Sequence, residues 1–321
     1  MKDAWGRTIE YVRLSLTDAC NFCCPYCRPA EITPQSQHQL LSVDEWMTIL
    51  GAFHQVGVKA VRLTGGEPLL YPHIEELLAR IKQTGWFEDI SMTTNGSLLA
   101  PRAAKLKELG LNRVNISLDS LDSDAFTLCV GKANQLDSVL NGIQSAIDAG
   151  FTSVKINTVL SRHWIDDEVH DLLTYVETWP VIWRFIEYMP FQGDAFHGPT
   201  FDEWKAQLER VSGGILTENH DVYGFGPATY YNLPSGKEIG FIFSMSHSYC
   251  DTCNRVRLTS DGQMRLCLLR DDEADLVSRV RRGLSETELA SHIEWALQRK
   301  QERHDGVTMD QPERPMWRIG G

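Results

Sequence analysis

The chain lacks the long apolar run that a membrane-spanning helix requires. No segment of its 321 residues reaches the ~18 uninterrupted apolar residues of such a helix, and the opening MKDAWGRTIE holds no apolar core of signal-peptide length. Positive charge is also scarce, because 31 Lys and Arg face 43 Asp and Glu, a net charge of -12. We therefore expect a cytoplasmic protein with no membrane association, and the negative charge argues against binding to a nucleic-acid backbone.

Two groups of cysteines each lack a fourth member. They read C-x3-C-x2-C at Cys20, Cys24 and Cys27, and C-x2-C-x13-C at Cys250, Cys253 and Cys267. A structural zinc site uses four protein ligands, whereas three thiolates leave one position of a metal centre open for a small molecule. Clustered cysteines in a reducing compartment indicate metal or redox chemistry rather than disulfides. The two triplets therefore predict an enzyme.

Short β-rich runs alternate with longer amphipathic stretches from Tyr11 to Tyr188, the pattern of βα units and a parallel sheet. The predicted helices include residues 42–54, which open with a capping pattern, and residues 101–109, which open with a proline. Six strands are predicted, at residues 11–16, 60–63, 89–93, 113–118, 153–159 and 181–187.

Several of these strands carry a polar residue at every second position, as Arg13 and Ser15 do between Val12, Leu14 and Leu16. Parallel strands buried on both faces are usually apolar throughout, so one face here is expected to meet helices and the other a polar cavity. Because the interior of a closed eight-stranded barrel is packed, we predict an α/β fold with an incomplete (β/α)6 TIM-type barrel. A half-exposed sheet face is the alternative.

The rhythm changes after Tyr188. A helix is predicted over residues 201–209, antiparallel strands over 223–269, and a charged helical tail over 272–301. These elements predict two domains: residues 1–220, with the barrel and the first triplet, and residues 221–321, a smaller α+β domain with the second triplet.

The first triplet follows strand 11–16 directly and so belongs to a loop at the carboxyl end of the barrel, where active sites of such folds lie. Its spacing can wrap one [4Fe-4S] cluster and leave one iron open. A zinc site that recruits Cys23, or unrelated buried thiols, are the alternatives. With Tyr26 before the last cysteine and Gly65-Gly66-Glu67-Pro68 after strand 60–63, the chain resembles the radical S-adenosylmethionine (SAM) superfamily. This resemblance implies SAM contacts from Tyr26, Gly65, Gly66, Glu67, Ser117 and Met189.

The second triplet narrows the resemblance to one family. With Lys155-Ile-Asn-Thr, Arg184-Phe-Ile-Glu-Tyr-Met189-Pro and the final Gly320-Gly321, the chain resembles the GTP 3',8-cyclases of molybdenum cofactor biosynthesis. The resemblance implies a second [4Fe-4S] cluster that holds the guanine base of GTP. It further implies catalytic roles for Arg255, Arg257, Gly320 and Gly321. It also implies GTP contacts from Arg13, Arg62, Thr93, Lys155, Arg184, Arg255 and Arg257.

The reaction implied by this resemblance begins with a 5'-deoxyadenosyl radical that removes H3' from the GTP ribose. The C3' radical then attacks guanine C8, giving (8S)-3',8-cyclo-7,8-dihydroguanosine 5'-triphosphate. The implied partners are a low-potential electron donor and a downstream cyclic pyranopterin monophosphate synthase, and a homodimer stays open.

The residues themselves agree with an anionic ligand. Arg13 and Lys155 fall on the polar strand face, and Arg62 stands between two apolar neighbours, so a buried cation at each position would need an anion. Solvated surface charges are the alternative. The terminal Gly320-Gly321 could enter the cavity without side-chain clash, or be a frayed end. The ten histidines show no metal-ligand spacing.

Two further functions stay open at this point. One is a radical SAM enzyme with an auxiliary cluster acting on a peptide or another small molecule, and the other is a zinc-binding regulatory protein. Cys23, Tyr71 and the stretch 128–134 depart from the pattern common in the cyclase family. These departures leave room for an altered substrate.

Overall fold

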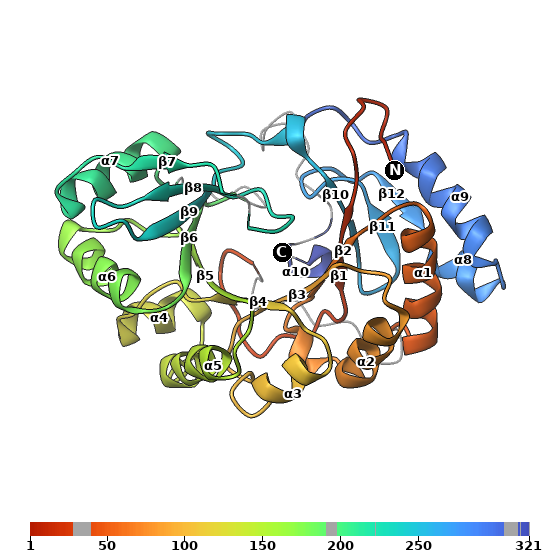
Figure 1. The fold of residues 1–321 in the computed structure, drawn as a ribbon, viewed down its shortest axis with the longest axis horizontal. Helices are drawn as coiled ribbons and strands as arrows, with labels where there is room; N and C mark the ends of the chain where they lie inside the picture. The colour runs from red at the N-terminus through yellow and green to blue at the C-terminus, as the bar shows by residue number, and fades with distance from the viewer. Residues whose placement is uncertain (28–39, 191–197, 222, 305–313, 315, 321) are drawn as a thin grey trace.

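The computed structural model describes residues 1–27, 40–190, 198–221, 223–304, 314 and 316–320. Its twelve strands form one sheet in the order β12-β11-β10-β1-β2-β3-β4-β5-β6-β9-β8-β7. Figure 1 shows this sheet curving around a central space, with helices α1 to α6 on its outer side. The two ends of the strand order, β12 and β7, do not pair with each other. The predicted incomplete barrel is therefore confirmed.

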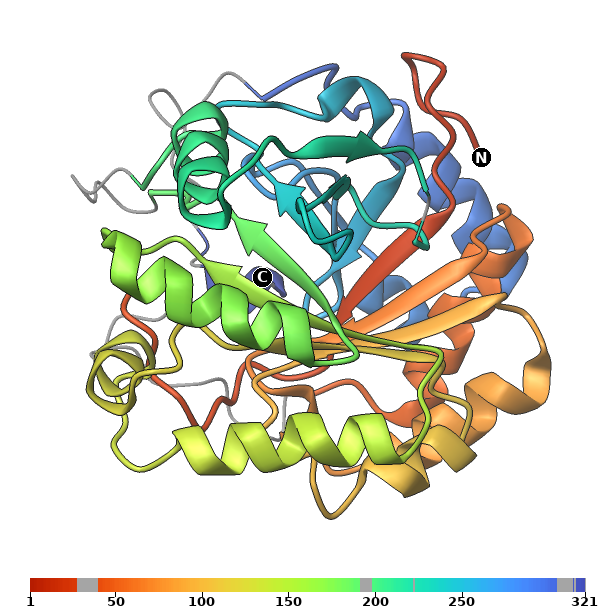
Figure 2. The same ribbon diagram turned by 60° about the vertical axis from the view of Figure 1, so that its left-hand side comes forward.

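Six parallel strands form the middle of the sheet, and each pairs with the next in chain order. Figure 2 shows several of them side by side. Every one overlaps a predicted strand, with ends that differ by two residues at most. They are β1 (Tyr11–Ser15), β2 (Ala60–Thr64), β3 (Asp89–Thr94), β4 (Arg113–Ser117), β5 (Ser153–Val159) and β6 (Ile182–Ile186).

The helices between these strands are α1 (Val43–Gln55), α2 (Ile74–Thr84), α3 (Ala103–Glu108), α4 (Ser123–Val130), α5 (Leu136–Asp148) and α6 (Asp166–Thr178). The predicted capping pattern at α1 is confirmed. The Ser42 hydroxyl accepts a hydrogen bond from the Glu45 amide at 3.2 Å, and the Glu45 carboxylate accepts one from the Ser42 amide at 2.8 Å. The predicted start at Pro101 is wrong, because the chain makes a turn there and α3 begins at Ala103.

The C-terminal part contributes strands to both edges of the barrel sheet. Its elements are α7 (Phe201–Ser212), β7 (Thr217–Asn219), β8 (Thr229–Asn232), β9 (Glu238–Ile242), β10 (Arg255–Leu258), β11 (Gln263–Arg265), β12 (Glu273–Asp275), α8 (Val277–Arg281), α9 (Glu286–Leu297) and α10 (Met316–Ile319). Strand β9 pairs parallel with β6, and β10 pairs parallel with β1.

The predicted antiparallel pairing holds within β7-β8-β9 and within β10-β11-β12. The predicted helical tail is divided, because residues 273–275 form an edge strand and Gly283, with φ of 83°, separates α8 from α9. None of the described helices is both long and apolar enough to cross a bilayer.

The alternation along the strands separates two environments. Val12 and Leu14 of β1 are fully buried in the main apolar cluster, which also contains Trp46 and Phe53 of α1. Arg13, between them, lines an interior cavity. The inner face of the sheet is therefore polar and faces a cavity, as the strand pattern predicts.

Candidate active site

The first cysteine triplet lies in the loop after β1, and this loop packs tightly against the two glycines after β2. The Gly66 amide donates to the Thr17 carbonyl at 2.7 Å, and the Glu67 amide donates to the Ala19 carbonyl at 2.8 Å. A Cβ atom on Gly65 would stand 2.6 Å from the Thr17 carbonyl oxygen, and the φ of Gly65 is 152°. Only glycine permits this approach, so Gly65-Gly66 positions the backbone that carries Cys20.

The chemistry of the first triplet fits a shared metal cluster better than isolated thiols. Burial raises the pKa of Cys24 well above its usual range, and the negative charges of Cys27, Asp119 and Cys20 raise it further. Three thiolates at this spacing therefore repel one another unless a cationic centre lies among them. Across the described ranges, no group of three His, Cys, Asp or Glu side chains is placed to bind one metal ion.

Glu67 is bound by the protein itself. Its carboxylate accepts hydrogen bonds from the Thr94 hydroxyl at 2.7 Å, the Asn95 amide at 2.8 Å and the Leu69 amide at 3.1 Å. It caps the 3-10 helix η2 (Pro68–Leu70) and is fully buried, and burial raises its pKa to about 7. Glu67 therefore joins the loops after β2 and β3, whereas Gly65 and Gly66 line the cavity.

Tyr26 also contacts a buried carboxylate. Its hydroxyl donates to Asp119 at 2.7 Å, and the other oxygen of Asp119 accepts from the Val159 amide at 2.8 Å. Burial raises the pKa of Asp119 to about 6. The loops after β1 and β4 and the end of β5 meet at this carboxylate, which the sequence analysis did not single out.

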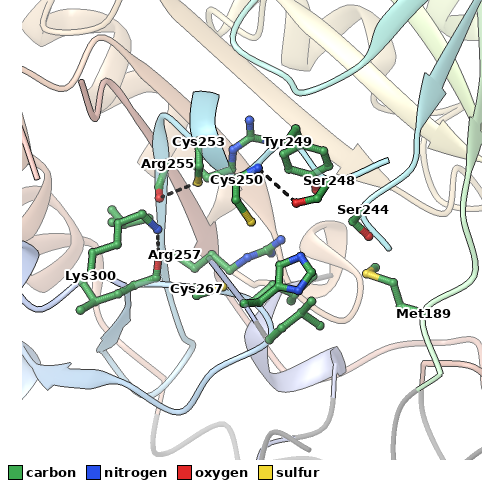
Figure 3. A pocket seen from close by; sticks show the side chains of 15 residues that line it. Met189, Ser244, Ser248, Tyr249, Cys250, Cys253, Arg255, Arg257, Cys267 and Lys300 are labelled. Atoms are coloured by element: carbon green, nitrogen blue, oxygen red, sulfur yellow. Dashed lines mark hydrogen bonds between the residues drawn. The ribbon is translucent and has the colours of Figure 1, made fainter. Parts of the chain in front are cut away.

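The second cysteine triplet lines a separate hollow of about 530 Å³, together with Tyr249, Lys300 and His304. Figure 3 shows Cys250, Cys253 and Cys267 around it, in the same pocket as Arg255 and Arg257. Cys250 lies in the 3-10 helix η3 (Cys250–Thr252), Cys253 ends that helix, and Cys267 follows β11. The fold therefore brings together three thiols that the sequence spaces over 18 residues.

Positive groups surround the second triplet. Burial acts to raise the pKa of Cys250, but hydrogen bonding with His304 and Ser248 outweighs burial and leaves the pKa at about 6. Burial likewise opposes ionisation of Cys253, yet the charges of Lys300 and Arg255 lower its pKa. These surroundings favour thiolates, the form that binds metal. The histidine pattern gave no signal for His304, because it lies 37 residues from Cys267 in the chain.

A large interior cavity begins at the first triplet and adjoins the hollow of the second. It encloses about 1500 Å³ between protein atoms, counting the part open to solvent, and Cys20, Cys24 and Cys27 line one part of it. The hollow at the second triplet shares five lining residues with this cavity, which are Met189, Tyr249, Arg255, Arg257 and Leu268.

The cavity wall between the triplets is cationic. Arg13, Arg62 and Arg257 occupy the same level on three adjacent strands, since Arg13 is the register partner of both Arg62 and Arg257. Burial, followed by the charge of Arg257, lowers the pKa of Arg13 well below its usual range. Burial lowers the pKa of Arg257 to about 10. Buried cations this close to one another are stabilised by an anionic ligand.

Unsatisfied polar atoms also face this region. The Thr93 hydroxyl and the Arg255 Nε atom are buried, and neither makes a hydrogen bond within the described part of the chain. Both residues line the cavity, as do Ser117 and Met189. Buried polar atoms of this kind are rare in proteins, so they indicate places where a ligand supplies the missing partner.

Two predicted site residues are already held by other side chains. Lys155 is 2% exposed, and its amine donates to the Tyr223 carbonyl at 2.9 Å and the Tyr230 hydroxyl at 3.1 Å. Burial, then the charges of Arg184, Arg113 and Arg62, lower its pKa to about 6. Lys155 is absent from the cavity lining given by the described residues.

Arg184 does line the cavity, but its donors serve two asparagines that the sequence analysis did not single out as partners. Nη2 of Arg184 donates to Asn115 and Asn157 at 2.6 Å each, and Nε donates to Asn157 at 3.0 Å. These bonds tie β4, β5 and β6 together across the barrel interior.

The C-terminal helix α10 lies inside the ring of strands (Figure 1). Gly320 is buried, its carbonyl accepts a hydrogen bond from Arg257, and a Cβ atom on it would collide with the Thr64 hydroxyl. The alternative of a frayed end is therefore wrong for Gly320, while Gly321 lies outside the described residues.

Comparison with known proteins accounts for this arrangement. Residues 14–176 match the model of the radical SAM superfamily, and residues 181–306 match that of the Molybdenum Cofactor Synthesis C family. The chain is 39% identical over 326 residues to the GTP 3',8-cyclase of Moorella thermoacetica, covering 100% of both chains. It is 42% identical over 330 residues to that of Trichodesmium erythraeum, covering 98% of this chain and 99% of the relative.

A solved structure supports the fold independently. Streptococcus suis SuiB bound to S-adenosylmethionine superposes with a TM-score of 0.63 over 84% of this chain and 64% of that chain, at 16% identity. This likeness concerns the fold alone. Since the cyclase relatives match along the whole sequence, the chain belongs to the GTP 3',8-cyclase family of radical SAM enzymes.

Proposed function

We propose that this chain converts GTP to (8S)-3',8-cyclo-7,8-dihydroguanosine 5'-triphosphate, the first step of molybdenum cofactor biosynthesis. The observation that carries the proposal is a pair of adjoining cavities, each with one cysteine triplet, that share buried arginines in their common wall. Two ligands that must react with each other need adjoining sites, and a triphosphate would be attracted to this cationic wall.

In this proposal, residues 1–220 form the SAM-binding domain. Cys20, Cys24 and Cys27 would hold a [4Fe-4S] cluster, and SAM would contact Gly65, Gly66, Ser117, Tyr26 and Met189. Glu67 would act indirectly, by joining the loops after β2 and β3. Its carboxylate already accepts hydrogen bonds from Thr94, Asn95 and Leu69. Gly65 and Gly66 leave backbone exposed to the cavity with no side chain in front of it.

Residues 221–321 would form the domain that holds the base of GTP. Cys250, Cys253 and Cys267 would bind a second [4Fe-4S] cluster, whose open iron would take the guanine. The thiolate-favouring surroundings of Cys250 and Cys253 support this assignment. The shared lining residues would then place the base beside the ribose-binding part of the cavity.

The remaining contacts would orient the nucleotide. Arg13, Arg62, Arg255 and Arg257 would bind the phosphates and guanine, and Thr93 would donate its free hydroxyl to the ligand. Arg184 would contribute positive charge from the cavity wall itself, and Lys155 would do so from the layer of side chains behind it. Gly320, with Gly321, would complete the site beside Arg257.

When bound, the first cluster and SAM supply the one-electron chemistry that removes H3' of the ribose and lets C3' bond to guanine C8. The protein residues bind and orient both ligands and exclude water. The electron would come from a low-potential donor protein, and the product would pass to a cyclic pyranopterin monophosphate synthase. We place this reaction in the cytoplasm, where thiols remain reduced.

Anaerobic reconstitution with iron and sulfide, followed by incubation with SAM, GTP and a strong reductant, tests the proposal. We expect 5'-deoxyadenosine and the cyclised nucleotide to form in equal amounts. If neither product appears with GTP while 5'-deoxyadenosine forms with a peptide or another small molecule, the substrate assignment is wrong. Sedimentation of the same sample determines whether the enzyme is the homodimer that we also propose.

A further inference from the structure

The last described residues form a buried segment rather than a loose end. We call Arg314 together with residues 316–320 the C-terminal plug. Met316, Trp317 and Ile319 of the plug are 8%, 1% and 0% exposed, and Met316 lines the large cavity. Apolar burial explains why the plug stays in the barrel, but it does not explain how the Gly320 carbonyl is aimed at Arg257.

One end of the plug is attached beside the second triplet. Nη1 of Arg314 lies 2.8 Å from Asp261 Oδ2, in the turn between β10 and β11. Nε of Arg314 lies 2.8 Å from Glu273 Oε1, and the same carboxylate is bound by the fully buried Arg265 at 2.6 Å. Asp261 falls between Cys253 and Cys267 in the chain, so this network attaches the plug to the hairpin of the second triplet.

The other end is attached beside the first triplet. Nε of Arg318 is buried and lies 3.5 Å from Asp18 Oδ2, two residues before Cys20. Asp18 itself is 2% exposed, and its other oxygen accepts a hydrogen bond from the Ser260 hydroxyl. One buried carboxylate therefore contacts the loop of the first triplet, the hairpin of the second and the plug.

We propose that Asp18 is a positioning residue that couples the two cysteine loops to the plug and holds the Gly320 carbonyl on Arg257. This role rests on the proposed function, in which Arg257 binds GTP. Arg318 stands two residues before Gly320, within half a turn of α10, so fixing its guanidinium fixes the direction of the next carbonyls. The contact between Arg318 and Asp18 is an ion pair at 3.5 Å rather than a hydrogen bond, and the carboxylate is its buried member.

The main experiment compares Asp18→Asn, which keeps the shape of the side chain and removes its charge, with Arg318→Gln. Hydrogen exchange of the backbone amides of residues 316–320 is the direct readout. We expect each variant to raise this exchange about twofold to fivefold, the range by which loss of a partly exposed ion pair changes a local equilibrium. The double variant is expected to exchange no faster than the single variants, since both remove one interaction.

Kinetics provide the second readout. A freed carbonyl leaves Arg257 mobile, so KM for GTP is expected to rise while KM for SAM stays unchanged. Arg318→Lys, which keeps the charge, is expected to recover part of the exchange protection. Arg281→Gln is the matched control, because Arg281 pairs with Glu45 at 2.7 Å on the outer surface, and it should change neither readout.

Unchanged exchange in both Asp18→Asn and Arg318→Gln would overturn the proposal. Should Asp18→Asn fail to fold, Arg318→Gln and Ser260→Ala answer the same question without removing the carboxylate. If the wild-type protein makes no cyclised nucleotide but the exchange results are as expected, then the proposed function is wrong and the anchoring role of Asp18 stands.

Discussion

The two cysteine triplets differ in how their surroundings treat a thiolate. At the first, burial and the negative charges of Cys27, Asp119 and Cys20 raise the pKa of Cys24. At the second, His304 and Ser248 bring the pKa of Cys250 down to about 6, and Lys300 and Arg255 lower that of Cys253. Two sites with three cysteines each therefore have surroundings that shift the thiol pKa in opposite directions.

This difference in thiol pKa fits different functions for the two cysteine triplets. The charges that act most strongly on Cys24 are all negative, so a metal cluster there would retain a high electron density and donate an electron more readily. The second lies among the arginines that we assign to an anionic substrate. The same cations that favour its thiolates would also attract GTP. Neutral side chains at these positions could neither stabilise the thiolates nor attract the triphosphate.

The largest expected effect comes from removing one ligand at each site. Cys24→Ser and Cys253→Ser should each reduce the iron content from about eight to about four per chain, because each [4Fe-4S] cluster holds four irons. Cys24→Ser should abolish 5'-deoxyadenosine formation, whereas Cys253→Ser should keep it and lose the cyclised nucleotide. Iron analysis and product chromatography measure both.

Cys23→Ser is the matched control for this pair, since Cys23 is exposed and adjacent to Cys24 in the chain. It should retain the iron and both products. If Cys253→Ser stopped 5'-deoxyadenosine formation as completely as Cys24→Ser, the division of work between the two sites would be wrong.

Removing a cation from the shared wall should produce the next largest effect. Arg257→Gln is expected to raise KM for GTP by roughly tenfold to a hundredfold, the range for a lost hydrogen bond to a charged group. KM for SAM should stay the same, because Arg257 belongs to the end of the cavity shared with the second triplet. Arg303→Gln is the control, because Arg303 forms an exposed ion pair with Asp251 beside Cys250. Equal changes in KM for GTP and KM for SAM would contradict the assignment of Arg257 to the GTP end of the cavity.

The pH dependence of GTP binding should show whether Lys155 belongs to the substrate end. Its pKa is lowered from 10.5 to about 6, so Lys155 is neutral at pH 7 in the free protein. A nearby triphosphate favours the charged form, so binding should take up a proton, and affinity should weaken as the pH rises above about 6. Calorimetry in buffers of different ionisation enthalpy measures this uptake.

Lys155→Met should abolish this proton uptake. The same variant gives a second check through stability, since unfolded Lys155 is protonated up to about pH 10.5 while the folded side chain loses its proton near 6. Wild-type stability should therefore gain from rising pH across that interval, and the variant should lack this gain. If the wild-type protein and Lys155→Met showed the same pH dependence of GTP affinity, Lys155 would be excluded from the substrate site.

The smallest expected effect concerns the first site alone. Tyr26→Phe removes the hydrogen bond to Asp119 and should lower the free energy of unfolding by about 1–2 kcal/mol. The loss should be larger above pH ~6 than below it, because the pKa of Asp119 is about 6 and the hydroxyl favours the ionised carboxylate. Urea titration measures it, with Tyr175→Phe, a half-exposed residue, as the control. A loss of equal size on both sides of that pH would argue for a purely steric effect.

Local patterns in the sequence predicted the barrel strands well. Val12 and Leu14 alternate with Arg13 because each strand separates a helix-covered face from the cavity, and that requirement is visible in a few adjacent residues. The capping pair of α1 was predictable for the same reason. The cysteine spacings likewise predicted which thiols belong to the same site.

Contacts between distant residues were not predictable. Nothing in the residues around Glu67 indicates that Thr94 and Asn95 would occupy its carboxylate, and the buried contacts of Asp18 join residues 242 positions apart. The parallel pairing of β10 with β1 has no local signature either, since β10 is followed by antiparallel partners. Such contacts depend on the whole fold, which a single sequence pattern does not encode locally.

The pairing of β1 with β10 also sets an order of events during synthesis. Tyr11 of β1 has Arg255 as its register partner, so more than two hundred residues must leave the ribosome before this edge of β1 is covered. Until then β1 presents unpaired backbone groups, the situation in which strands of different chains associate. A nascent chain interrupted before residue 255 would therefore keep an unpaired strand edge. The strand whose arginines we assign to GTP would thus also protect the newly made barrel from aggregation.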